Sequence, residues 1–291
     1  MSGYPVLSIF EEISAYEALW DHPNASFRTL ATQLSDFPYH LASSFVDPLT
    51  IDAYKKTLLP IFKSLSKFGA RIDGDGMFPI RLKDARHPLK IFYFQGNWEL
   101  SYLPSVAIVG TRNPTSEGIE RTRYLAKRLV SDKFAIVSGL AKGIDTAAHQ
   151  AAIENNGNTI AVIGTPLNRC YPSENLNLQN TIARDFLLVS QVPFSKYSKQ
   201  DFRKNRFFFP ERNITMSALS QATIIVEAGE TSGTLVQAKA ALEQGRKLII
   251  LENNFLQPSL TWPKKLQEQG AIRVKDYEQI RELLSPSSSA Y

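Results

Sequence analysis

The stretch that decides the fold reads VAIVGTRNPTSEG at residues 106–118 and AIVSGLAKG at residues 135–143, with an amphipathic segment between them. Each apolar run is short, rich in β-branched residues and followed by a glycine, which is typical of a strand buried on both faces. In the intervening segment Ile119, Leu125 and Leu129 recur at roughly helical spacing, and charged residues fill the opposite face. The stretch therefore predicts a strand–helix–strand unit with a right-handed crossover.

The same pattern, an apolar run followed by a glycine, recurs further along the chain. TIAVIGT at 159–165 and TIIVEAGETSGT at 223–234 again end an apolar run at a glycine. Strands that alternate with helices indicate an α/β fold with a Rossmann-like, doubly wound, mostly parallel sheet. We predict its strands at residues 106–109, 135–137, 159–163, 187–191, 223–227, 247–251 and 272–274.

The pattern changes along the chain and predicts three regions. Residues 1–66 carry short helical patterns broken by turn signals, which indicates a small helical N-terminal domain. Residues 67–284 form the Rossmann-like domain, and its first part, 67–104, supplies lead-in strands. The tail SPSSSAY at 285–291 is too small and polar to pack, so we expect it to be disordered.

The composition is that of an ordinary water-soluble chain with a mild excess of positive charge. Among 291 residues, 33 are Lys or Arg and 28 are Asp or Glu, so the net charge of +5 permits an anionic partner without requiring one. No apolar run is long enough to span a membrane, and the N-terminus lacks a signal-peptide profile. One cysteine excludes an intrachain disulfide, so we expect a cytoplasmic protein. Four histidines and one cysteine without ligand spacing predict no metal site, and we expect no cofactor.

If the predicted strands are parallel, the glycines that follow them lie at one edge of the sheet. Glycine lets a backbone N–H approach a ligand closely, and the helix that follows points its positive end toward the same edge. Several such turns together form a site for phosphate. Phosphate binding is therefore the main functional prediction from these residues.

Three turns carry the candidate contacts. Arg112 follows the first strand, where its planar guanidinium can hold a phosphate through two hydrogen bonds; the alternative is that it pairs with a nearby carboxylate. Ser138 and Gly139 can form a nest of backbone N–H donors, to which Lys142 adds a point charge. Residues 232–234 open a helix and offer a further nest.

The sequence offers fewer candidates for acid–base catalysis than for phosphate binding. Asp145 and His149 lie four residues apart on one helix face, but no nucleophile is close in sequence, so structural packing is the favoured interpretation. Cys170 has no histidine or helix start placed to lower its pKa and is interpreted as a buried small residue. Glu227 and Glu230 form a carboxylate pair after a strand, and Glu227 is a candidate general base only if a partner group lies nearby.

Residues 195–213, SKYSKQDFRKNRFFFPERN, interleave basic and aromatic side chains. Single-stranded nucleic acid is bound by basic residues that follow its backbone and by aromatic faces that stack on its bases. The alternative is an ordinary loop whose phenylalanines anchor it to the core while its cations stay in water. The sequence leaves both interpretations open.

Together these motifs resemble the DNA-processing protein A family, also called DprA or Smf. The resemblance covers about residues 78–272. Its segments, in the family's order, are VAIVGTR, SGLAKGIDTAAHQAA, NTIAVIG with a later YP..N, FPERN followed by a serine, and VEAGETSGTLVQAKAALEQGR. It implies a non-catalytic, homodimeric recombination mediator that binds and protects single-stranded DNA and loads a RecA-type recombinase in natural transformation. The DNA- and phosphate-binding residues that result from the turns and from this resemblance are Gly110, Thr111, Arg112, Ser138, Gly139, Lys142, Arg212, Asn213, Ser232, Gly233 and Thr234.

The chain departs from the family pattern at several places. Ile214 stands where an arginine is common, Gln191 where a glutamate is common, and residues 252–254 replace a Pro-Gly turn. The sequence ends before the C-terminal winged helix that many members add, so we expect a divergent member without that domain. The alternative function is that of a nucleotide-binding enzyme or sensor similar to the lysine-decarboxylase-like phosphoribohydrolases, in which Glu227 and residues 232–234 would form the active site.

Overall fold

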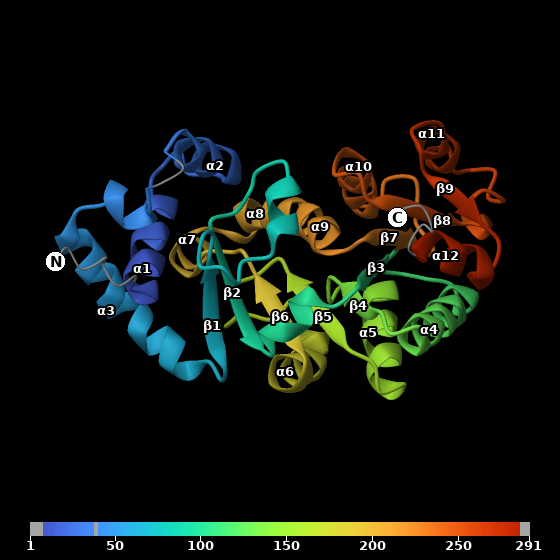
Figure 1. The fold of residues 1–291 in the computed structure, drawn as a ribbon, viewed down its shortest axis with the longest axis horizontal. Helices are drawn as coiled ribbons and strands as arrows, with labels where there is room; N and C mark the ends of the chain where they lie inside the picture. The colour runs from blue at the N-terminus through green and yellow to red at the C-terminus, as the bar shows by residue number, and fades with distance from the viewer. Residues whose placement is uncertain (1–7, 38–39, 286–291) are drawn as a thin grey trace, which may run out of the picture.

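Seven parallel strands form most of one nine-stranded sheet, and an antiparallel pair extends one of its edges (Figure 1). The computed structural model describes residues 8–37 and 40–285. Of the tail that we predict to be disordered, residues 286–291 lie outside the described residues, and Ser285 is the C-cap of the last helix. The strands are β1 Phe68–Ile72, β2 Ile91–Gly96, β3 Ser105–Val109, β4 Ala135–Ser138, β5 Thr159–Ile163, β6 Leu187–Ser190, β7 Ala222–Ile225, β8 Lys247–Leu251 and β9 Ile272–Val274.

The strand order, β1-β2-β6-β5-β4-β3-β7-β8-β9, contains one reversal of direction. The chain moves outward from β3 through β4 and β5 to β6, and then returns to place β7 on the other side of β3. In the register, Ala107 of β3 lies between Val137 of β4 and Thr223 of β7. A crevice at the carboxyl ends of the strands is expected where the order reverses, which here is between β3 and β7.

Helices cover both faces of the sheet, because each parallel connection has to cross one of them (Figure 1). Residues of β3 alternate accordingly: Val106 and Ile108 join the core under α4 and α5, whereas Ala107 and Val109 join the core on the opposite face. The predicted Rossmann-like, doubly wound α/β fold is thus confirmed. The helices of this part are α4 Ser116–Ser131, α5 Ile144–Glu154 and α6 Leu176–Asp185 on one face, and α9 Phe208–Leu219, α10 Thr234–Glu243 and α11 Trp262–Glu268 on the other, followed by α12 Tyr277–Leu284.

Three helices precede the sheet, and each starts at a side-chain cap. They are α1 Ile9–Trp20, α2 Phe27–Asp36 and α3 Pro48–Ser64, capped by Ser8, Ser26 and Asp47. Their buried residues belong to the same core as those of β1 and β2. The division into domains that we predict near residue 66 stays a prediction. None of the helices in the described ranges is long and apolar enough to cross a membrane.

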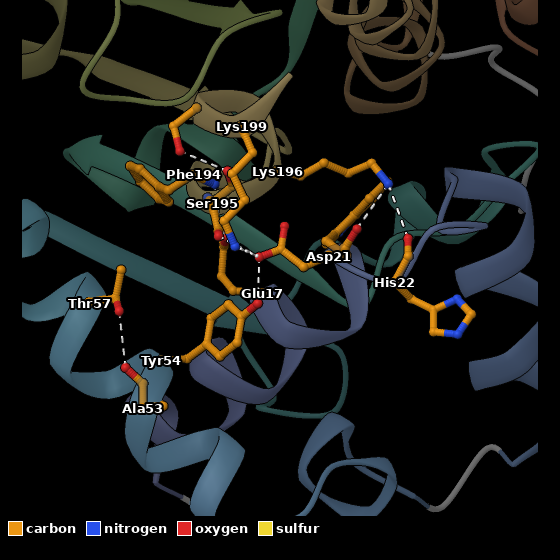
Figure 2. A network of polar contacts seen from close by, with 12 residues as sticks. Glu17, Asp21, His22, Ala53, Tyr54, Thr57, Phe194, Ser195, Lys196 and Lys199 are labelled. Atoms are coloured by element: carbon orange, nitrogen blue, oxygen red, sulfur yellow. Dashed lines mark hydrogen bonds and ion pairs between the residues drawn. The ribbon is translucent and has the colours of Figure 1, made fainter. Parts of the chain in front are cut away.

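A buried carboxylate joins the N-terminal helices to the rest of the chain (Figure 2). Glu17 of α1 accepts hydrogen bonds from the backbone N–H groups of Phe194 and Ser195, both at 2.9 Å, and from the hydroxyl of Tyr93 at 2.8 Å. Phe194 and Ser195 are the first residues of α7, Phe194–Lys199, so the carboxylate satisfies N–H groups that the helix itself cannot pair. Since all three donors are buried, Glu17 fixes α7 against α1.

The same helix α7 contributes two cations to this junction. Lys196 donates to the carbonyl oxygens of Trp20 and Ala25, both at 3.0 Å, at the end of α1. Lys199 forms an ion pair with Asp21, which also accepts from Ser195 Oγ at 2.6 Å (Figure 2). These contacts hold the N-terminal helices in place beside the segment 195–213.

Burial raises the pKa of Glu17 from its usual 4.5 to about 7. The folded state therefore holds this proton more tightly than the unfolded state. Its contribution to stability is complete below about pH 4.5 and is lost as the pH rises through about 7. We predict that wild type loses up to about 3 kcal/mol of unfolding free energy relative to the non-titrating Glu17→Gln between about pH 5 and pH 8. Urea unfolding of both proteins across this range measures the difference, and parallel pH profiles would contradict the assignment.

Candidate functional site

A crevice of about 500 Å³ lies at the carboxyl ends of β3, β4 and β7, at the point where the strand order reverses. Its walls are the turn after β3, the turn after β7, part of the turn after β4, and the side of α9. Sequence reasoning predicts this location, because it follows from parallel strands that end in glycine. The side chains within the crevice, however, do not all have the predicted roles.

The turn after β3 presents one cation to solvent. Gly110 has no room for a side chain, since an added Cβ would lie 2.6 Å from both the Glu227 carbonyl oxygen and Ile144 Cγ1. Arg112 lines the crevice, is exposed, and makes no side-chain hydrogen bond or ion pair with any residue in the described ranges. The alternative that Arg112 pairs with a nearby carboxylate is therefore wrong. The Thr111 hydroxyl lies in the same turn and accepts from the Asn113 N–H at 3.2 Å.

The turn after β7 brings the start of a helix into the crevice. Thr234 begins the ten-residue helix α10, and its hydroxyl donates to the Gly110 carbonyl oxygen at 3.2 Å, which joins the two turns. Ser232 Oγ accepts from the Thr234 N–H at 3.2 Å. The N–H groups of Thr231 and Gly233 have no acceptor within the described part of the chain. Free N–H groups and the positive end of the helix dipole favour an anion here.

Arg212 of α9 is a buried cation at the base of the crevice. Its side chain is 5% exposed, and Nη1 donates to the carbonyl oxygens of Gly139 and, at 2.7 Å, Val162. The predicted role as a phosphate contact is thus only partly available, because one end of the guanidinium is used to join the ends of β4 and β5. Burial lowers the pKa of Arg212 to about 10, with the nearby Arg112 adding to the effect, so the group remains charged at neutral pH.

Asn213 of α9 and Arg206, which precedes that helix, also line the crevice. Asn213 accepts from Arg212 Nε at 2.8 Å and donates to the Gly233 carbonyl oxygen at 3.1 Å, so its amide links Arg212 to the turn after β7 and keeps one N–H for a ligand. Arg206 is exposed and lines the crevice, but was not among the predicted site residues. The available signal was its place in the basic and aromatic segment 195–213.

The turn after β4 does not provide the predicted nest. Asp145 Oδ2 accepts from the N–H groups of Gly139 at 3.1 Å and Ala141 at 3.3 Å, so these donors are already used. Ser138 is fully buried, and its hydroxyl donates to the Ile108 carbonyl oxygen at 2.7 Å, which places it outside the crevice. The prediction of free donors at Ser138 and Gly139 is wrong, because a first-turn carboxylate of α5 satisfies this turn from within.

Asp145 is also the one acidic side chain among the residues that line the crevice. It is 5% exposed, and burial raises its pKa, while the charge of Arg212 acts in the opposite direction. Three arginines therefore face one buried carboxylate that is already engaged with backbone N–H groups. The net positive potential of the crevice is retained.

Lys142 lies in a smaller pocket beside the crevice, which shares Arg112 and Arg212 with it. Lys142 forms an ion pair with Glu174, and both side chains are about half exposed. Because a surface ion pair of this kind is weak, an incoming phosphate can replace Glu174. Tyr171 and Phe209 line the same small pocket, with ring centroids 5.4 Å apart.

The acid–base candidates have structural roles. His149 is fully buried, its Nδ1 lies 2.6 Å from Thr159 Oγ1, and burial lowers its pKa to about 3, which confirms the packing interpretation. Glu227 accepts from the Thr115 N–H at 3.0 Å and the Thr115 hydroxyl at 2.7 Å, and does not line the crevice. Glu230 instead accepts from the Thr261 N–H at 2.8 Å, so the two carboxylates form no pair. Within the described ranges, no group of three His, Cys, Asp or Glu side chains is placed to hold a metal ion.

The segment 195–213 is helical and divides between the two interpretations. Its first part, α7, anchors the N-terminal helices as described above, and Phe208 is buried against Trp20 and Phe27. Its middle part, which includes the short helix α8 Phe202–Asn205, is exposed: Phe202 is 59% and Phe207 77% accessible. Phe208 anchors the segment to the core, as the loop interpretation predicts, but Lys196 and Lys199 contact the end of α1, which that interpretation does not predict. The nucleic-acid interpretation remains open for the middle part.

Comparison with known proteins agrees with this architecture. The model of the family described as DNA recombination-mediator protein A matches residues 70–285. The chain belongs to this family. It is 36% identical to the DNA processing protein DprA of Bacillus subtilis, over 74% of this chain and 70% of the relative, and 35% identical to that of Streptococcus pneumoniae, over 75% of each.

Two solved structures extend the comparison to three dimensions. The DprA structure from Streptococcus pneumoniae matches with a TM-score of 0.75 and 27% identity, over 95% of this chain and 98% of that one. A structure of DprA from Helicobacter pylori, described as giving insight into the single-stranded DNA binding mode of that protein, matches with a TM-score of 0.63 and 27% identity, over 75% and 96% of the two chains. The match to the pneumococcal protein includes the N-terminal helices.

The positions at which we expect a departure from the family pattern make contacts within the protein. Gln191 is 1% exposed and accepts from the Thr215 hydroxyl. Ile214 packs against the core. Asn254, in the segment that replaces a Pro-Gly turn, accepts from the Ala228 N–H at 3.1 Å and donates to the Val226 carbonyl oxygen at 3.0 Å. Of these residues, Asn254 contacts the turn after β7 that lines the crevice.

Gly139 tests the fixed position of Arg212. An added Cβ would lie 2.6 Å from Arg212 Cζ, so we predict that Gly139→Ala displaces the guanidinium and lowers the free energy of unfolding by about 1–3 kcal/mol. Gly233→Ala is the matched control, because nothing lies within 4 Å of its added Cβ and its φ is −60°. Urea unfolding compares the two variants, and equal stabilities would show that Arg212 is not held as described.

Proposed function

We propose that this chain binds single-stranded DNA in the crevice between β3 and β7 and acts as a non-catalytic recombination mediator. The observation that carries the proposal is the convergence of Arg112, Arg206 and Arg212 with the start of α10 on one open crevice. Two of these arginines have no partner among the described residues, so their charges are available to phosphate. The single-stranded DNA binding described for the Helicobacter pylori member of the family supports the same ligand.

The finer parts of the role rest on membership of the DNA recombination-mediator protein A family. We propose that the protein protects single-stranded DNA, loads a RecA-type recombinase onto it and works as a homodimer, in DNA uptake and recombination. The arrangement of the crevice is consistent with this role, because contacts to phosphate hold a strand without selecting its sequence.

The alternative is a nucleotide-binding enzyme of the phosphoribohydrolase kind. A crevice of about 500 Å³ is large enough for a mononucleotide, which favours keeping this candidate in the test. The contacts of Glu227 speak against it, since the carboxylate that would act as the base accepts two hydrogen bonds from Thr115 and is not among the residues that line the crevice. Under the proposed function, Glu227→Gln binds single-stranded DNA as wild type does.

A salt titration with three ligands tests the proposal. We expect a single-stranded oligonucleotide to bind more tightly than a duplex or a mononucleotide. If about three phosphates are contacted, its affinity falls by about 10- to 20-fold between 50 and 200 mM salt. Arg112→Ala should weaken binding of oligothymidylate and oligodeoxyadenylate by the same factor and reduce the slope of log affinity against log salt by about 0.7. Fluorescence anisotropy measures both.

Lys127→Ala, on the exposed face of α4 away from the crevice, is the control for general loss of positive charge. Two results would overturn the proposal. One is an Arg112→Ala variant that binds single strands as wild type does at moderate salt. The other is a preference for mononucleotides together with release of free base that Glu227→Gln abolishes.

A further inference from the structure

A second groove, of about 440 Å³, lies on the other side of the α9 N-terminus, between that helix and α2. Its floor consists of Trp20, Phe27 and Phe208, which are 8% exposed or less and contact one another edge-on or tilted, with ring centroids 4.8–6.1 Å apart. The junction made by Glu17 and α7 holds these rings in place. The groove is thus a fixed feature of the fold and includes the N-terminal helices.

An exposed aromatic ring stands at the rim of this groove. Phe207 is 77% accessible, although it directly precedes the first turn of α9 and neighbours the buried Phe208. An exposed phenylalanine on a well-defined backbone loses little freedom when a flat ligand stacks on it. Base–aromatic stacking of this kind tolerates any base sequence.

Cations accompany the ring. Arg28 and Lys204 line the groove, are exposed, and form no side-chain hydrogen bond or ion pair with other residues in the described ranges. Lys196 also lines it, and its amino group donates to backbone carbonyl oxygens, which leaves its charge without a carboxylate partner in the same ranges. Glu211 is the one acidic lining residue, and it lies 3.4 Å from His87. The groove therefore attracts an anion.

The groove and the crevice are lined by two residues that are adjacent in the sequence. Arg206 lines the crevice, and Phe207, the next residue, lines the groove. We propose that the groove is the second half of the single-stranded DNA path, an inference that rests on the proposed function of the crevice. The phosphate backbone leaves the crevice at Arg206, one base stacks on Phe207, and Arg28 and Lys204 contact the phosphates that follow.

Binding of oligothymidylates of two lengths, about 4 and about 16 nucleotides, tests this path by fluorescence anisotropy. Phe207→Ala should weaken binding of the long strand by about 5- to 160-fold, the worth of one base–aromatic stack, and leave binding of the short strand unchanged. Phe207→Trp, which keeps an aromatic ring at this position, should bind the long strand as tightly as wild type does. Arg28→Ala should weaken binding of the long strand but not of the short one. It should also reduce the slope of log affinity against log salt for the long strand by about 0.7. Leu256→Ala, at a 68% exposed residue near the far edge of the sheet, should change neither.

The outcomes separate the groove from the crevice. If Arg112→Ala weakens both lengths while Phe207→Ala and Arg28→Ala weaken neither, the groove proposal is overturned and the crevice proposal stands. If Arg112→Ala leaves both lengths unchanged, the proposed function itself fails. If the Phe207 and Arg28 variants bind long DNA normally but lose binding of polyglutamate, the groove takes an acidic protein segment instead, which overturns the proposal as well.

Discussion

The buried guanidinium of Arg212 is the interaction on which the site depends. It donates to carbonyl oxygens at the ends of β4 and β5 and lies beside the buried Asp145. These contacts fix the start of α9 across the carboxyl edge of the sheet. As a result, Arg206 faces the crevice and Phe207 faces the groove beside α2. Together with the buried ring of Phe208 at the start of the helix, this contact holds α9 where it forms a wall of both cavities.

Positive charge is concentrated at this edge of the sheet for the same reason. Arg112 lies close enough to Arg212 to help lower its pKa, and Arg206 lines the same crevice. Like charges held together by the fold repel one another until an anion neutralises them. The free N–H groups at the start of α10 add to this preference. A phosphate bound in the crevice is therefore stabilised both by the arginine side chains and by the start of α10.

Sequence reasoning could predict the fold and the position of the crevice, because both follow from alternating strands and helices and from glycines at strand ends. It could not predict which donors are free. The N–H groups of Gly139 and Ala141 are taken by Asp145, and the Ser138 hydroxyl by the Ile108 carbonyl oxygen. Such contacts depend on side-chain directions across neighbouring strands and helices. The spacing of residues along the sequence does not predict these contacts.

In segment 195–213 the sequence likewise does not show which basic side chains are free to bind a ligand. Its composition leaves nucleic-acid binding and simple anchoring open along its whole length. In the structure, Lys196 and Lys199 contact the end of α1, whereas Arg206 and Arg212 line the crevice. Which cations are structural was decided by the packing of the N-terminal helices. These helices lie far away in sequence, so their effect on the segment could not be read from its residues.

A crystal structure of the protein with a short oligothymidylate tests the central claim most directly, because it shows where the phosphates lie. The account predicts a phosphate within hydrogen-bond distance of Arg112 and of the N–H groups at the start of α10, with Arg212 still joined to Gly139 and Val162. An oligonucleotide bound to another face, with the crevice vacant, would contradict it.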